Sequence, residues 1–182
     1  LRSYSIGFED VGDEAGNEFR YSDIVAERFG TDHEQIFIDS RTLLPRLPEA
    51  LRAMSEPMVS HDCIAFYLLS EEVSKRSKVV QSGQGADEVF GGYHWYPPMM
   101  SSTDAVADYA RVFCDRDHQE YLRTVDARFH GDDHARAFIA RHFALPGARE
   151  PVDQTLRMDT QIMLVDDPVK RVDNMTMAHG LE

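Results

Sequence analysis

The order of strand-like and helix-like segments in the first half of the chain most restricts how it can fold. Residues 3–8, 34–38 and 78–81 have the short alternating or apolar patterns of β-strands. Residues 13–29 and 62–77, which lie between them, carry apolar side chains at helical spacing. Strands that alternate with helices are joined by right-handed crossovers and build a parallel sheet with flanking helices. We therefore expect an α/β fold for this half.

Two prolines complicate the segment that follows the second of these strands. Ser40 is the expected N-cap of a helix whose apolar positions continue to Met54. Pro45 and Pro48 lie inside that pattern, and an internal proline removes one backbone hydrogen bond from a helix. The sequence therefore predicts two short helical pieces here.

The second half of the chain contains helical patterns alone. They run through residues 104–140 and 152–165, and Pro168 is the expected first residue of a last helix. We therefore expect an α-helical C-terminal extension, with the α/β nucleotide-binding part over residues 1–93 and the helical part over residues 94–182.

The composition excludes several classes of protein. The net charge of −13 argues against nucleic acid as a partner, because phosphate binding needs clustered Lys and Arg. No apolar run is long enough to span a membrane. The two cysteines, Cys63 and Cys114, are too few for a disulfide framework, so the cytoplasm is the expected compartment.

A glycine-rich loop, Ser82-Gly83-Gln84-Gly85, follows the third predicted strand. Open parallel sheets bind ligands at the carboxyl ends of their strands, where a serine hydroxyl and backbone amides can hold phosphate or ribose oxygens. The loop is not the dinucleotide fingerprint, because Glu88 takes the place of its third glycine, and no Gly-Lys-Ser/Thr follows as in a Walker A loop. The pattern fits either a nucleotide site or a glycine-rich turn without a ligand.

Two acids, Asp87 and Glu88, come directly after this loop. Hard cations prefer carboxylate oxygens, so one acid can bind magnesium on a polyphosphate while the other braces the loop. The alternative is an acidic first helical turn that complements the helix dipole. The aromatic and proline-rich residues 94–98 then form either the lip of a substrate pocket or plain packing.

A second dense segment of charged residues covers positions 166–182. Asp166, Lys170 and Asp173 share one helical face, because they are spaced by four and three residues. This spacing alone favours a salt-bridged face in contact with solvent.

Several segments together resemble the synthetase domain of the asparagine synthetase family of ATP-dependent amidotransferases. Residues 82–93 are similar at almost every position to the family's Ser-Gly-Glu-Gly-Ala/Ser-Asp-Glu-x-Phe-Gly-Gly-Tyr loop. Residues 4–8 resemble its second sheet strand, residues 29–34 its Gly-Thr-x-His-x-Glu corner and residues 55–57 its Glu-Pro turn. Residues 166–182 resemble its Asp-x-x-x-Lys-x-x-Asp-x-x-x-Met-x-x-x-x-Glu helix. The resemblance covers the chain in order and implies an adenine nucleotide alpha-hydrolase-like fold, here incomplete.

This resemblance implies a reaction. ATP activates a carboxylate substrate as an acyl-adenylate and pyrophosphate is released; ammonia derived from glutamine then forms the amide while AMP leaves. Magnesium (Mg²⁺) neutralises the phosphate charge. The resemblance also implies roles for seven residues. These are Ile6, whose backbone contacts adenine; Ser82 and Gly83 at the AMP moiety; Asp87 on magnesium; Asp173 at the acceptor substrate; and Gln84 and Glu182 as catalytic candidates.

Two parts of the family pattern do not occur in this sequence. Its sequence includes neither the Ser-Gly-Gly-x-Asp-Ser pyrophosphate loop nor the N-terminal glutamine-hydrolysing domain with its cysteine nucleophile. We expect that loop just before residue 1, and we expect the isolated chain to be inactive. We also expect the exposed edge of its incomplete sheet to favour either a homodimer through that edge or a rearrangement.

Gln84 stands where the family usually has glutamate. Glutamine cannot act as a base, although it can orient a reactant through hydrogen bonds. We therefore expect an acceptor other than aspartate, as in the branch of the family that amidates N-acetylglutaminylglutamine. A β-lactam-forming cyclase of the same fold and a non-catalytic binding module are the alternatives.

Overall fold

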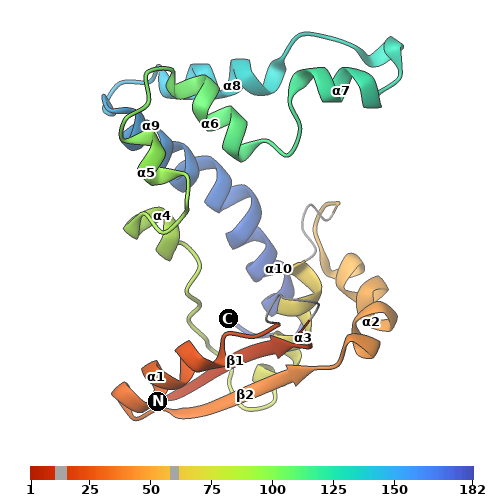
Figure 1. Ribbon diagram of the computed structural model, residues 1–182. Coiled ribbons are helices and arrows are strands. Elements are labelled where there is room, and N and C mark those ends of the chain that lie inside the picture. Colours follow the sequence, from red (N-terminus) through yellow and green to blue (C-terminus); the bar gives the residue numbers. More distant parts are fainter. Residues whose placement is uncertain (11–15, 58–61) are drawn as a thin grey trace. The chain divides into compact units, whose positions relative to one another are not determined.

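The computed structural model describes residues 1–10, 16–57 and 62–182 (Figure 1). The chain divides into two compact units. None of the helices in the described part has both the length and the hydropathy needed to cross a lipid bilayer.

The boundary between the units lies in the glycine-rich loop. The first unit comprises Leu1–Ser82 together with Val169–Glu182, and the second comprises Gly83–Pro168. The division therefore falls after residue 82, whereas the sequence pattern placed it after residue 93. The last 14 residues also return to the first unit instead of staying with the helical part.

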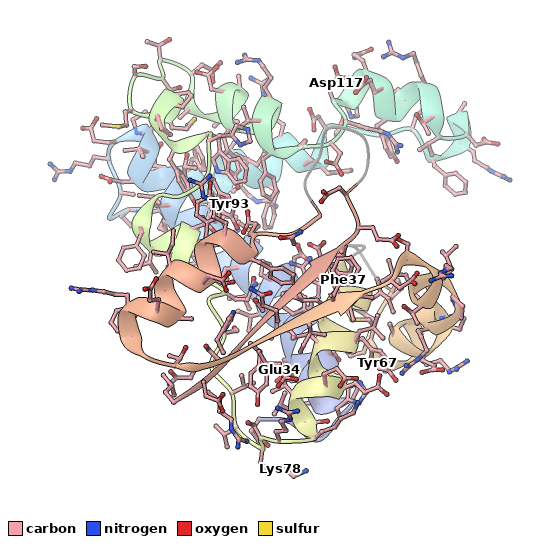
Figure 2. All side chains as sticks on the ribbon, turned by 60° about the horizontal axis from the view of Figure 1, so that its bottom comes forward. Glu34, Phe37, Tyr67, Lys78, Tyr93 and Asp117 are labelled. Carbon is pink, nitrogen blue, oxygen red and sulfur yellow. The ribbon has the colours of Figure 1, made fainter. Side chains whose placement is uncertain are left out.

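The first unit contains a short parallel sheet, as the strand and helix order predicts. Strands β1 (Arg2–Phe8) and β2 (Asp32–Ile38) pair in parallel, with Arg2 opposite Asp32 and Phe8 opposite Ile38. Helix α1 (Phe19–Phe29) connects them; of the residues predicted to precede Phe19 in this helix, 16–18 are not helical and 13–15 lie outside the described part. Figure 2 shows Glu34 and Phe37 on β2, where Arg76 donates to Glu34 at 2.7 Å.

The third predicted strand, residues 78–81, does not form. Its backbone pairs instead with Glu182, whose N–H donates to the Lys78 carbonyl at 2.9 Å and whose carbonyl accepts from the Val80 N–H at 2.7 Å. Val79 is 72% exposed, so this segment is not the buried central strand that its apolar residues indicated. A run with two adjacent β-branched residues is too short for its sequence to indicate whether it is buried, because tertiary contacts decide this.

Helix α2 (Ser40–Ala53) is continuous through Pro45 and Pro48, so the prediction of two short pieces is wrong. Packing against α3 (Asp62–Ser74) offsets the lost backbone hydrogen bonds: Arg46 donates to Glu71 at 3.0 Å, and Ala50 is fully buried.

The N-cap of α2 also differs from the expected Ser40. It is Asp39, whose carboxylate accepts from the Arg41 N–H at 2.8 Å. The hydrogen bonds from Arg41 lower the pKa of Asp39 to about 2. Asp39 and Ser40 are both good capping residues, so sequence preference alone could not separate them.

The core of the first unit joins three helices. Ala50 from α2, Cys63 from α3 and Met175 from α10 (Lys170–Met177) form one buried cluster. Phe66 and Tyr67 pack against it. The C-terminal helix therefore completes the core of the unit that begins with β1.

The second unit is helical in its regular elements, as predicted. Its core consists of Met99, Tyr109, Ile139, Phe143 and Met158. The elements are α4 (Ala86–Phe90), α5 (Tyr96–Met99), α6 (Ala105–Phe113), α7 (His118–Thr124), the 3₁₀ turn Ala127–Phe129, α8 (His134–Phe143) and α9 (Pro151–Met158).

The backbone after α9 continues through two π-helical segments. They cover Asp159–Met163 and Val165–Val169, and α10 begins at the next residue. Pro168 lies inside the second segment and is buried, so it does not open a new helix as expected. The wider π-helical turn accommodates a proline without the i to i−4 bond that an α-helix would lose.

Candidate functional site

The seven residues to which the sequence assigned roles fall in both units, and each unit fixes its own set. The first unit holds Ile6, Ser82, Asp173 and Glu182, and the second holds Gly83, Gln84 and Asp87.

Glycines shape the loop that opens the second unit. Gly85 has φ +95°, and Gly91, which ends α4, has φ +69°; residues with a Cβ avoid this left-handed region. The Ala86 N–H donates to the Gly83 carbonyl at 3.2 Å, which closes the turn. Ser82, Gly83 and Gln84 are exposed, so their polar groups are accessible to a ligand.

Asp87 lies against Gly92. A Cβ on Gly92 would fall 2.0 Å from Asp87 Oδ1, and the Gly92 N–H donates to the Asp87 carbonyl at 2.9 Å. Only a residue without a side chain at position 92 leaves the carboxylate where it is. The exposed side chain of Asp87 therefore has a defined place at the end of the loop.

The two acids after the loop have opposite surroundings. Asp87 is exposed, whereas Glu88 is 3% exposed. Glu88 Oε1 accepts from the Tyr93 hydroxyl at 2.9 Å, and among the described residues nothing hydrogen-bonds to Oε2. Burial, together with the hydrogen bond to Glu88, raises the pKa of Tyr93, which keeps that hydroxyl protonated as a donor. These surroundings suit the exposed Asp87 to metal binding and the buried Glu88 to support of the loop.

The aromatic residues after Tyr93 pack inward. Tyr96 is 3% exposed, and its hydroxyl donates to Asp159 Oδ2 at 2.8 Å. Trp95 Nε1 donates to the same oxygen at 3.0 Å, and the Tyr109 hydroxyl donates to Oδ1. Of the two interpretations of residues 94–98, the structure supports packing for Trp95 and Tyr96.

Asp159 is the residue of this site that the sequence pattern did not reveal. It is fully buried and accepts three hydrogen bonds from aromatic side chains. The signal was present, because Asp159 interrupts a helix whose inward positions include Met158 and Ile162. Buried acids are kept where their hydrogen bonds are satisfied, so such an interruption merits a search for donors.

In the first unit, backbone hydrogen bonds place Glu182, one of the predicted residues, beside the segment that leads into the glycine-rich loop. Glu182 bonds on both sides of Val79, three residues before Ser82. Ile6 lies in the middle of β1 opposite Ile36. The two positions are thus fixed by sheet-type hydrogen bonds rather than by side-chain contacts.

The predicted charged face of the last segment has a partner elsewhere in the chain. Lys170 Nζ contacts the Glu56 carboxylate, and the Ser55 N–H donates to Asn174 Oδ1 at 3.1 Å. The Ser-Glu-Pro turn and α10 are therefore joined within the first unit. Asp173 is exposed on α10.

Asp87 fits one mode of magnesium binding better than another. Among the described residues, no group of three or more His, Cys, Asp or Glu side chains is placed to hold a metal ion. Magnesium rarely needs such a cage, because it keeps several waters and takes one or two carboxylates plus substrate phosphates. An exposed Asp87 that follows an exposed glycine-rich loop matches that second mode.

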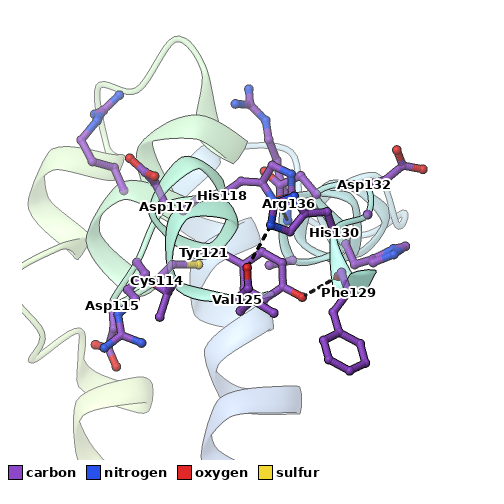
Figure 3. Close-up of a pocket in the computed structure, with 18 of the residues that line it drawn as sticks. Cys114, Asp115, Asp117, His118, Tyr121, Val125, Phe129, His130, Asp132 and Arg136 are labelled. Atoms are coloured by element: carbon purple, nitrogen blue, oxygen red, sulfur yellow. Dashed lines mark hydrogen bonds between the residues drawn. The ribbon is translucent and has the colours of Figure 1, made fainter. Parts of the chain in front are cut away.

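A cavity of about 1000 Å³ lies elsewhere in the second unit, among α6, α7 and α8 (Figure 3). Its lining includes none of the seven predicted residues. Tyr121 donates to the Phe129 carbonyl at 3.2 Å, and burial raises the pKa of the Cys114 thiol. Arg128 and Arg136 on its wall each pair with an aspartate.

Comparison with known proteins gives one family for the whole chain. The family model described as asparagine synthase matches residues 1–182. A Mycobacterium bovis protein, provisionally named an asparagine synthetase (glutamine-hydrolyzing), is 26% identical over 218 residues. That alignment covers 100% of this chain and 33% of the relative, so the chain spans a third of that relative's length.

Two further relatives match about half of the chain. Asparagine synthetase (glutamine-hydrolyzing) 1 of Bacillus subtilis is 30% identical over 101 residues, which cover 56% of this chain and 16% of the relative. A Methanocaldococcus jannaschii protein, provisionally named asparagine synthetase (glutamine-hydrolyzing) 2, is 36% identical over 93 residues, 51% of this chain and 17% of its own length.

Proposed function

Because this chain belongs to the asparagine synthase family, we propose that it carries nucleotide- and magnesium-binding elements of an ATP-dependent amidotransferase. The observation that carries the proposal is the glycine-rich loop, whose residues 82–84 are exposed and which is followed by the exposed Asp87, held against Gly92. We propose the whole reaction for the natural protein, at the length at which the cell makes it; this chain spans a third of its relative from Mycobacterium bovis.

The role proposed for each residue follows from the chemical group that it can offer to the ligand. Ser82 and Gly83 bind the AMP moiety with hydroxyl and amide donors, and the backbone at Ile6 contacts adenine. Asp87 holds magnesium, which neutralises phosphate charge when bound. Gln84 orients a reactant through its amide, since it has no basic group. Asp173 and Glu182 face the acceptor.

The proposed chemistry has two steps. An oxygen of the acceptor carboxylate attacks the α-phosphorus of ATP, the bond to the β-phosphate oxygen breaks, and pyrophosphate leaves. Ammonia from glutamine then attacks the acyl carbon, the acyl–oxygen bond breaks, and AMP leaves with the electron pair. The chain supplies orientation and charge stabilisation, which can account for a large part of such a rate enhancement.

Oxygen-18 transfer tests this proposal. When the natural protein receives glutamine, ATP and an acceptor labelled in its carboxylate, one label should appear in AMP, because the attacking oxygen stays on phosphorus. Mass spectrometry of the AMP measures it, with aspartate and N-acetylglutaminylglutamine as the two acceptors. Because Gln84 replaces the usual glutamate, we expect the dipeptide to transfer more label. Formation of ADP and labelled phosphate, without labelled AMP, would contradict the adenylation step.

Gly92→Ala tests the placement of Asp87. The new Cβ would sit 2.0 Å from Asp87 Oδ1, so the carboxylate must move. We expect the magnesium concentration for half-maximal pyrophosphate release to rise about tenfold, the scale on which disturbed ligand support acts. Gly91→Ala is the control: it strains a residue at φ +69°, but its Cβ meets nothing nearer than 3.8 Å. An equal shift in both variants would mean that backbone strain, not Asp87, is responsible.

A further inference from the structure

A continuous path of contacts connects the acidic turn to the buried Asp159 inside the second unit. Glu88 accepts from Tyr93, whose ring stacks on Trp95 at 4.2 Å between centroids and 18° between planes. Trp95 in turn donates to Asp159. The path therefore runs from an acid beside Asp87 to the start of a π-helical segment.

Each end of this path is fixed by burial. Asp159 is fully buried, and Tyr96 and Tyr109 hold its carboxyl group along with Trp95. Glu88 is 3% exposed, and Tyr93 supplies the hydrogen bond to its Oε1. A buried carboxylate that loses a donor is costly to keep in place, so Tyr93 controls whether Glu88 stays where it is.

We propose that Tyr93 is a positioning residue: stacked on Trp95, which Asp159 holds, it fixes Glu88 and thereby the adjacent Asp87 side chain for a magnesium–nucleotide ligand. This inference rests on the proposed function for the role of Asp87, but not for the network itself. Tyr93 acts through Glu88, which precedes it by five residues across the Gly91–Gly92 turn. Its hydroxyl fixes the acid, while its ring anchors the turn to Trp95.

Tyr93→Phe separates these two roles, because it removes the hydroxyl and keeps the ring. The matched control is Tyr121→Phe, which removes one tyrosine hydrogen bond, to the Phe129 carbonyl, at the cavity wall in the same unit (Figure 3). The chain has one tryptophan, so fluorescence emission reports on Trp95 alone and shows whether the ring stack persists.

The first measurement needs no activity. Amide hydrogen exchange over residues 86–92 should become about tenfold faster in Tyr93→Phe, since a hydrogen bond to a buried carboxyl group is lost, and should not change in Tyr121→Phe. Trp95 emission should match the parent in both variants. Unchanged exchange in Tyr93→Phe, or a shifted Trp95 emission that reveals a lost stack, would overturn the positioning role.

The second measurement connects the network to the ligand. Electron paramagnetic resonance of Mn²⁺ with α,β-methylene-ATP, on the natural protein, should give a dissociation constant about tenfold higher for Tyr93→Phe and unchanged for Tyr121→Phe. Equal affinities in Tyr93→Phe and parent would overturn the link to Asp87. A parent that binds no metal–nucleotide would overturn the proposed function instead, while the exchange comparison still decides the network.

Discussion

Asp87→Asn should lower pyrophosphate release by the natural protein by roughly 100-fold or more at low magnesium, the range in which loss of a charge-stabilising group acts. Asparagine has nearly the same shape but carries no charge, so it is a poor ligand for a hard cation. Because the Asp87 carboxylate is exposed, its substitution requires no rearrangement of the core, and the variant should fold normally. Raising the magnesium concentration should recover part of the rate.

Asp132→Asn is the matched control for this loss. Asp132 is also an exposed aspartate of the second unit, and it lies at the wall of the cavity among α6, α7 and α8, outside the predicted site. Its substitution removes the same charge from the same unit, and the rate should stay within about twofold of the parent, as for most surface changes. Magnesium-dependent release that is equal in Asp87→Asn and Asp132→Asn would exclude Asp87 as a ligand.

Asp159→Ala should produce the largest loss of stability in the second unit, on the order of 3 to 5 kcal/mol. The substitution leaves the hydroxyls of Tyr96 and Tyr109 and the indole N–H of Trp95 without their acceptor. It also opens a small cavity where a fully buried side chain stood. Thermal unfolding followed by Trp95 fluorescence measures the effect.

Asp159→Asn is a milder substitution that tests the same hydrogen bonds. Its carbonyl oxygen can still accept from one side of the cluster, while its amide faces a donor on the other, so we expect a smaller loss than with alanine. Loss within about 1 kcal/mol for Asp159→Ala, the scale of an ordinary substitution, would show that the cluster contributes little.

The parts of the fold that the sequence predicted are those that depend on local pattern. The alternation in β1 and the helical spacing of α1 and α6 are repeated over enough residues to identify each element. The same reasoning failed for α2, because the contact of Arg46 with Glu71 lies 25 residues away and holds a helix through two prolines. It failed at residues 78–81 because their backbone partner is residue 182.

The candidate site was predictable where its geometry depends on glycine. The spacing of Gly85, Gly91 and Gly92 around Asp87 and Glu88 already indicates turns that approach a ligand closely. The different burial of the two acids was not predictable, since it follows from Tyr93 and the helices packed behind it. Asp159 was missed because its three donors come from positions 50 to 64 residues earlier in the chain.

The hydrogen bonds between residues 78–80 and Glu182 have a consequence for synthesis on the ribosome. They join backbone groups about a hundred positions apart, and contacts of such long sequence separation generally form late in folding. The segment that leads into Ser82 can therefore gain this support only after residue 182 has been synthesised, about a hundred positions later. During translation, the glycine-rich loop is therefore made well before the segment that precedes it is held in place.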